Sequence, residues 1–134
     1  MRMVDELFEL AAPKDLDPYV FESAVMVGLR HFKKAKDAAG CRRLIAMSEE
    51  LKPTDARCLY NLACYHAVTA AVLRTDKKSA AAAREADAEA DTAMTWLKQA
   101  VAAGFKNVTH MRNDEDLDNL RGRQDFQKLI AGLE

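Results

Sequence analysis

Apolar residues recur every three or four positions along most of this chain, the spacing that places side chains on one face of an α-helix. Hardly any segment shows the strict alternation of a β-strand, so the pattern predicts an all-α fold. The longer predicted helices cover 17–36, 41–51, 55–75, 79–103 and 125–133. Shorter helical segments are expected at 4–12, 107–111 and 114–120.

Capping residues set several of these ends. Asp17 followed by Pro18 is a strong start signal, because aspartate accepts from the first free N–H groups and proline fits the first helical position. Asp55 is placed to cap a later helix, two residues after Pro53, which ends the helix before it. Gly104 is the residue type expected just beyond a helix end, where the backbone turns left-handed. These signals divide the chain into helices with short connections.

The predicted helix at 55–75 is apolar on most of its circumference, so it needs neighbours on more than one side. One row of apolar residues along this helix, and one along the helix at 79–103, recurs at alternating steps of three and four residues, as in coiled coils. We call each such row a seam. We therefore expect the two helices to form an antiparallel hairpin that turns near Lys77. Expected neighbours across it are Leu59 with Leu97, Ala63 with Ala93, and His66 with Ala90. The expected seam of the second helix is Ala83, Ala86, Ala90, Ala93, Leu97, Ala100 and Gly104.

The chain also contains an internal repeat. Residues from Glu22 to Asp55 align with those from Ala56 onward at an offset of roughly 34 residues. With Leu62 and the closing Pro53, this pattern resembles the tetratricopeptide repeat (TPR), a helix–turn–helix unit. The resemblance implies an all-α, TPR-like antiparallel helical-hairpin superhelix with one elongated hairpin and a helical C-terminal cap. The single domain, 1–134, would comprise a first repeat at about 22–55, an elongated second repeat at 56–104 and capping helices at 105–134.

The second half of the chain, about residues 50–134, carries four linked motifs. They read Tyr60-Asn61-Leu62-Ala63-Cys64, Leu97 to Gly104, Asp114 to Arg121, and Asp125 to Leu129. Together they resemble the C-terminal TPR tail of large bacterial serine/threonine protein kinases. The resemblance implies a regulatory or interaction appendage. It implies no kinase activity, because the sequence has no Gly-rich loop, no His-Arg-Asp and no Asp-Phe-Gly.

Charge and composition narrow the class of partner. With 20 basic and 21 acidic residues the formal charge is −1, which gives no general attraction to nucleic acid or anionic membranes. No apolar run approaches the roughly 20 residues that span a bilayer, and the acidic N-terminus lacks the apolar core of a signal peptide. Three cysteines, an odd number without paired spacing, fit a reducing compartment, so a cytoplasmic protein is expected.

Two groups of residues have the chemistry of metal ligands. One has the spacing of a calcium loop: Asp114, Asp116, Asp118 and Asp125. The glycine and the final glutamate of such a loop are absent, so helix capping by these acids is favoured. In the other group, Cys58 and Cys64 accompany His66 on one helix, but their separation turns the two thiols to different faces. We therefore predict no metal site and no cofactor.

His66 lies on the apolar seam, where a buried histidine with one hydrogen-bonding partner is expected. Catalysis would need an acid or a nucleophile beside it, and Asp87 or Asp91 could reach it across the hairpin. We predict no catalytic residue. A small metal-binding protein or enzyme centred on His66 is the lesser alternative.

Basic residues gather between residues 30 and 43. In TPR proteins the first helix of each unit lines a concave groove, and on this chain such a groove would place basic residues over an apolar floor. The predicted lining is Met26, Arg30, Lys33, Lys34, Arg57, Tyr60, Cys64 and Ala67. We therefore predict a regulatory or scaffolding module that binds a protein or peptide, suited to an acidic or carboxylate-ended segment. A homo-oligomerisation domain is the main alternative.

Overall fold

The computed structural model describes residues 13–134, and every regular element in that range is helical, as predicted. The predicted helix at 4–12 lies outside the described residues. The chain divides into two compact units, the first ending at Lys52 and the second beginning at Pro53. The elements are the 3₁₀-helix η1 (Pro13–Asp15), α2 (Pro18–Lys34), α3 (Ala38–Glu50), α4 (Ala56–Arg74), α5 (Ala80–Ala102), α6 (Val108–Asn113), the 3₁₀-helix η2 (Glu115–Leu120) and α7 (Gln124–Leu133).

The first unit is built on the packing of α2 against α3. The Asp17 carboxylate caps α2 by accepting from the Tyr19 N–H, and Pro18 begins the helix, as predicted. One face of α2 is buried against its neighbour through Phe21, Ala24, Val25, Gly28, Leu29 and Phe32. The buried residues of α3 are Gly40, Cys41, Leu44, Ile45 and Ser48.

The start of α3 differs from the expectation. Residues 37–40 were expected to be a connection, but Asp37 is an N-cap whose carboxylate accepts from the Gly40 N–H at 3.0 Å, and the helix begins at Ala38. Gly40 lies against the ring of Phe32: a Cβ at this position would stand 2.3 Å from Phe32 Cδ1. The glycine thus serves close packing between two helices within a helical turn, which explains why it does not break α3.

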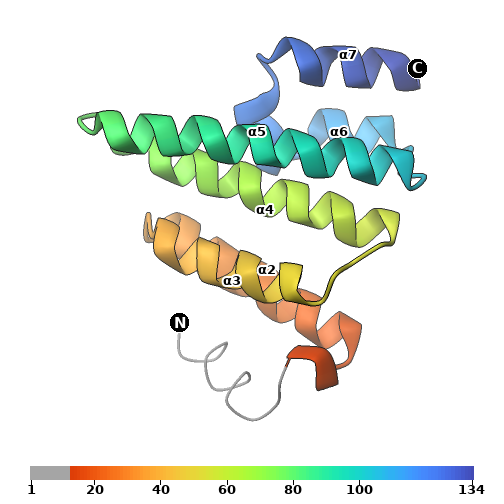
Figure 1. The fold of residues 1–134 in the computed structure, drawn as a ribbon, viewed down its shortest axis with the longest axis horizontal. Coiled ribbons are helices and arrows are strands. Elements are labelled where there is room, and N and C mark those ends of the chain that lie inside the picture. Colours follow the sequence, from red (N-terminus) through yellow and green to blue (C-terminus); the bar gives the residue numbers. More distant parts are fainter. Residues whose placement is uncertain (1–12) are drawn as a thin grey trace. The chain divides into compact units, whose positions relative to one another are not determined.

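The second unit is organised around the hairpin of α4 and α5, which lie side by side in Figure 1. The predicted hairpin and its turn are confirmed, and Leu59, Ala63, Ala93 and Leu97 belong to one core. Two seam positions are wrong, because Ala83 and Gly104 are exposed, and Ala82 is buried in place of Ala83. The buried residues of this hairpin core are Leu59, Tyr60, Ala63, Cys64, Ala67, Ala70, Ala90, Ala93, Met94, Leu97, Ala100, Met111, Leu117, Leu120, Phe126 and Ile130.

Gly104 ends α5 as predicted. Its φ of 112° lies in the left-handed region, its N–H donates to the Val101 carbonyl at 3.0 Å, and the Phe105 N–H donates to the Ala100 carbonyl at 2.9 Å. These two bonds form a Schellman motif, which satisfies carbonyl groups that the helix end leaves free. The chain then returns across the hairpin, so that η2 contacts both α4 and α5 while α7 contacts α5.

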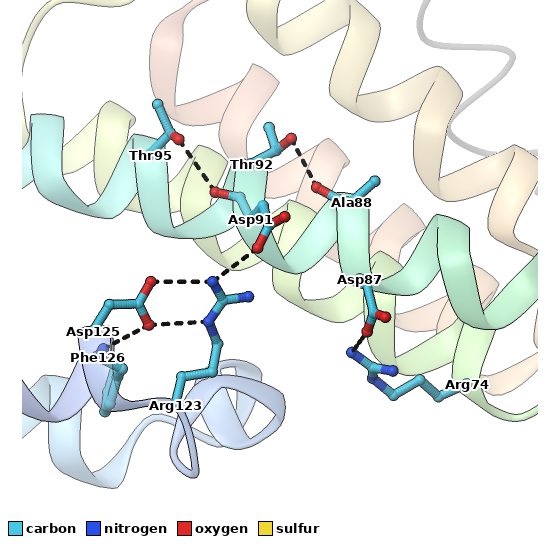
Figure 2. Close-up of polar contacts among 9 residues, drawn as sticks. All are labelled: Arg74, Asp87, Ala88, Asp91, Thr92, Thr95, Arg123, Asp125 and Phe126. Carbon is cyan, nitrogen blue, oxygen red and sulfur yellow. Dashed lines mark hydrogen bonds and ion pairs between the residues drawn. The ribbon is translucent and has the colours of Figure 1, made fainter.

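An arginine joins this returning segment to α5. Arg123 precedes α7 and donates to both carboxylate oxygens of Asp125 at 3.0 Å and to Asp91 of α5 at 2.8 Å, as Figure 2 shows. The hydrogen bond with Arg123 is the main reason that the pKa of Asp125 falls below its usual value. Figure 2 also shows the Arg74–Asp87 pair, a simpler contact at 2.8 Å between α4 and α5.

Within residues 13–134, no helix combines the length and the apolar character needed to cross a membrane.

Candidate functional site

The helix α2 carries large apolar side chains on the face opposite its buried one. Tyr19 is 70% exposed, Val20 45%, Met26 42% and Val27 38%. Steps of seven residues relate Tyr19 to Met26 and Val20 to Val27, so the four side chains lie along a common face of the helix. An amphipathic surface helix usually places charged residues there, which makes this face a candidate contact surface.

The same face continues into three basic residues. Arg30, Lys33 and Lys34 are all exposed and fall within one to two turns of Met26 and Val27. Both lysines lie in the last turn of α2, where cations complement the helix dipole. We call Tyr19, Val20, Met26, Val27, Arg30, Lys33 and Lys34 the α2 face. It contains the four predicted groove residues that belong to the first unit, Met26, Arg30, Lys33 and Lys34.

The four groove residues predicted on α4 are placed differently. Arg57 is exposed, whereas Tyr60, Cys64 and Ala67 are buried in the hairpin core. The ring of Tyr60 stacks on Phe105, with 4.1 Å between centroids and 4° between planes. Of the four side chains predicted here, Arg57 is therefore the accessible one, and the other three serve the packing of the second unit.

Three side chains converge on one oxygen of Asp114, at the N-terminus of η2. The Tyr60 hydroxyl donates to Asp114 Oδ2 at 2.7 Å, and the Cys64 thiol lies 3.6 Å from the same atom. From α6, His110 Nε2 lies 3.3 Å from it. Asp114 Oδ1 accepts from the Asp116 N–H at 3.0 Å, so Asp114 is also the N-cap of η2. We refer to Tyr60, Cys64, His110, Asp114 and Asp116 as the Asp114 cluster.

Burial dominates the electrostatics of this cluster. It raises the pKa of the Cys64 thiol well above its usual value, and the negative charges of Asp114 and Asp116 act in the same direction. The pKa of Tyr60 is also raised, first by burial and then by Cys64 and Asp114. Both groups are therefore protonated donors at neutral pH. The Cys64 thiol, the Asp114 carboxylate and the Asp116 carboxylate offer ligand atoms within 4.8 Å of one another.

No spacing along the sequence indicates this cluster. Cys64 and Asp114 are 50 residues apart, and their meeting depends on the return of the chain across the hairpin. The predicted capping role of the acidic segment is confirmed at Asp114. Two further acids with the spacing of a calcium loop pair with arginines, Asp118 with Arg121 at 2.8 Å and Asp125 with Arg123 at 3.0 Å.

His66 is buried, as expected, and it has a carboxylate partner. Its Nδ1 lies 2.6 Å from Glu89 Oε2 of α5, and both side chains are largely shielded from solvent. The two acids considered from the sequence bind arginines instead, Asp87 pairing with Arg74 and Asp91 with Arg123. The predicted core histidine with a hydrogen-bonding partner is therefore confirmed, with Glu89 as the partner.

Comparison of the chain with models of protein families, with curated proteins and with solved structures finds no match.

Proposed function

We propose that the chain is a TPR-like interaction module that binds an acidic, amphipathic peptide segment of another protein on the α2 face. The observation that carries the proposal is the joint exposure of Tyr19, Val20, Met26 and Val27 on one helix face. Apolar side chains of this size at the surface favour a partner that removes them from water. The proposal assigns no catalysis to the chain.

The chemistry of the partner follows from the charges at the end of the face. Arg30, Lys33 and Lys34 lie next to the apolar part, and none of them forms an ion pair with another residue of the described range 13–134. A segment with apolar residues at one end and carboxylates at the other would bury its apolar side chains near Met26 and meet the cations with its acids. Arginine adds bidentate hydrogen bonding to a carboxylate.

The architecture supports a repeat-type scaffold. α2 and α3 form a helix pair of 17 and 13 residues, and α4 and α5 form a longer hairpin of 19 and 23 residues. This succession agrees with the proposed first repeat and the elongated second repeat of a TPR-like superhelix. The resemblance of residues 50–134 to kinase TPR tails favours a regulatory or scaffolding role, in which the C-terminal helices cap the array.

A second copy of the chain is the other partner that an apolar face could accept. The charges favour the acidic peptide over this alternative, because a second copy would bring its own Arg30, Lys33 and Lys34 to the same contact. Solution mass separates the two cases, since homo-oligomerisation through the α2 face would give a concentration-dependent dimer that a Met26→Glu change disrupts.

The test begins with selection from a random peptide library displayed on phage, using the whole chain as bait. We expect selected peptides to combine apolar residues with an excess of Asp and Glu. Substitution of Arg30 and Lys33 by Glu should lower the affinity for the selected peptide at least about tenfold, equivalent to about 1.4 kcal/mol of binding free energy. The matched control carries Lys77→Glu and Lys78→Glu in the α4–α5 turn, with the same change in net charge.

Two results would contradict the proposal. One is a selected set without acidic excess. The other is equal loss of affinity in the α2 variant and in the control, which would indicate general charge attraction rather than a site.

A further inference from the structure

We propose that Cys64, Asp114 and Asp116, with His110 as the fourth ligand, form a binding site for a divalent transition-metal ion of the zinc class. The residues come from α4, α6 and η2, so the ion would join the hairpin to the returning segment. The proposal concerns the second unit and is independent of the peptide-binding face on α2.

Two of the distances between ligand atoms agree with a tetrahedral ion. With Zn–S near 2.3 Å and Zn–O or Zn–N near 2.0–2.1 Å, neighbouring ligand atoms stand about 3.5 Å apart for a sulfur–oxygen edge and about 3.3 Å for a nitrogen–oxygen edge. The structure has 3.6 Å between Cys64 Sγ and Asp114 Oδ2. It has 3.3 Å between His110 Nε2 and the same Oδ2. The carboxylate of Asp116 forms a group with Cys64 and Asp114 whose ligand atoms all lie within 4.8 Å. His110 lies outside this group, so its ring and the Asp116 carboxylate would have to move closer to the ion on binding.

The donor set selects the kind of ion. One thiolate, one imidazole and two carboxylates suit a borderline-soft ion such as Zn²⁺ or Co²⁺. Calcium and magnesium prefer oxygen ligands alone, so the buried sulfur disfavours both. A cluster made of Asp114 and Asp116 alone would not distinguish transition metals from calcium or magnesium. The thiol of Cys64 is the ligand that favours a transition metal.

The surroundings hold the ligands in place. The Tyr60 hydroxyl donates to Asp114 Oδ2 at 2.7 Å, and its ring is fixed by stacking on Phe105. The Arg121 guanidinium donates to the backbone carbonyls of Asp114 and Met111, which fixes the segment that carries the carboxylate. Hydrogen bonds of this kind orient metal ligands and raise affinity.

The buried thiol must lose its proton when the ion binds. The Zn–S bond replaces the S–H bond, the proton leaves to solvent, and the cation offsets the two carboxylate charges that face Cys64. Asp114 and Asp116 are partly exposed and His110 is half-exposed, so the ion can enter from that side. Bound metal would fix α6 and η2 on α4.

The test uses Co²⁺ and Zn²⁺ with the whole chain. We expect one Co²⁺ per chain and the near-ultraviolet absorption of a thiolate-to-cobalt bond, with displacement by Zn²⁺. Cys64→Ser should abolish this absorption, whereas Cys58→Ser, a matched change on the same helix, should keep it. Asp116→Asn and His110→Ala should each weaken metal binding at least about tenfold. Loss of a residue that only orients a ligand already costs about 10–100-fold, and these two residues are proposed as ligands themselves.

Absence of the thiolate absorption in the unaltered chain would overturn the proposal, and so would its persistence in Cys64→Ser. Circular dichroism establishes that each variant is folded. If Cys64→Ser does not fold, the decision rests on Asp116→Asn, a partly exposed position where unchanged affinity would equally contradict the site.

Discussion

Asp114 shows how one residue can hold distant parts of a chain together. Its Oδ2 accepts from Tyr60 at 2.7 Å, its Oδ1 accepts from the Asp116 N–H, and its side chain is only 14% exposed. A partly buried carboxylate needs such donors, because a charge without partners in this setting costs several kcal/mol. The residue therefore couples the N-terminus of η2 to the first half of α4.

Tyr60→Phe tests this coupling. The change keeps the stack on Phe105 and removes the hydroxyl that donates to Asp114. We expect the free energy of unfolding to fall by about 1.5–3 kcal/mol, the usual worth of a hydrogen bond to a charged group. Urea denaturation measures it. The control is Tyr19→Phe on the exposed α2 face, expected to change stability by less than about 0.5 kcal/mol; equal effects would contradict the account.

At the scale of elements, packing of α2 on α3 depends on one small residue. The ring of Phe32 occupies the space where a side chain at Gly40 would stand. Its rigid ring is held in the buried interface between the two helices, so it cannot move away at little cost.

Gly40→Ala should therefore destabilise the protein, although alanine is the better helix former. We expect a loss of about 1–3 kcal/mol from overpacking. Gly132→Ala in α7 is the matched control, because nothing lies within 4 Å of a Cβ there. That change should leave stability unchanged or raise it by up to about 1 kcal/mol. Thermal unfolding compares the two, and a stable Gly40→Ala protein would contradict the described packing.

The link between α7 and α5 should depend on pH. Arg123 lowers the pKa of Asp125 below its usual 3.8, so the carboxylate stabilises the folded state at pH values above 3.8. This contribution disappears as the pH falls through the lowered folded pKa. Arg123→Ala should cost about 1 kcal/mol at pH 7 and progressively less in acid.

Arg74→Ala is the control for this comparison. Its partner Asp87 is 70% exposed, so that ion pair should contribute less than about 0.5 kcal/mol. Arg74 also donates to Asn119 Oδ1 at 3.0 Å, and this hydrogen bond to an amide oxygen does not titrate between pH 7 and pH 3. Denaturation at pH 7 and at pH 3 checks both variants. An Arg123→Ala deficit that is unchanged at pH 3 would show that the ion pair is not its cause.

The sequence predicted most elements because their signals are local. Asp17, Asp55 and Gly104 act within a few residues of the ends that they set. Residues 37–40 were wrongly predicted to be a connection, because the role of Gly40 depends on Phe32, which faces it from another helix. The Asp114 cluster could not be predicted for a similar reason, since no spacing along the chain indicates a contact between Cys64 and Asp114.

At the scale of the whole molecule, the two proposed sites belong to different compact units. The α2 face lies in the first unit, which ends at Lys52, and the Asp114 cluster lies in the second, which begins at Pro53. The sequence predicts a single groove lined by residues of both units. Because Tyr60, Cys64 and Ala67 serve the hairpin core, the accessible part of that lining is concentrated on α2.

Amide chemical-shift mapping with a library-selected peptide tests the central claim most directly. We predict that the largest shifts fall on residues 19–34 of α2 and that they vanish in the variant carrying Arg30→Glu and Lys33→Glu. Shifts confined to residues 53–134 would contradict the account, and so would an unchanged map in that variant.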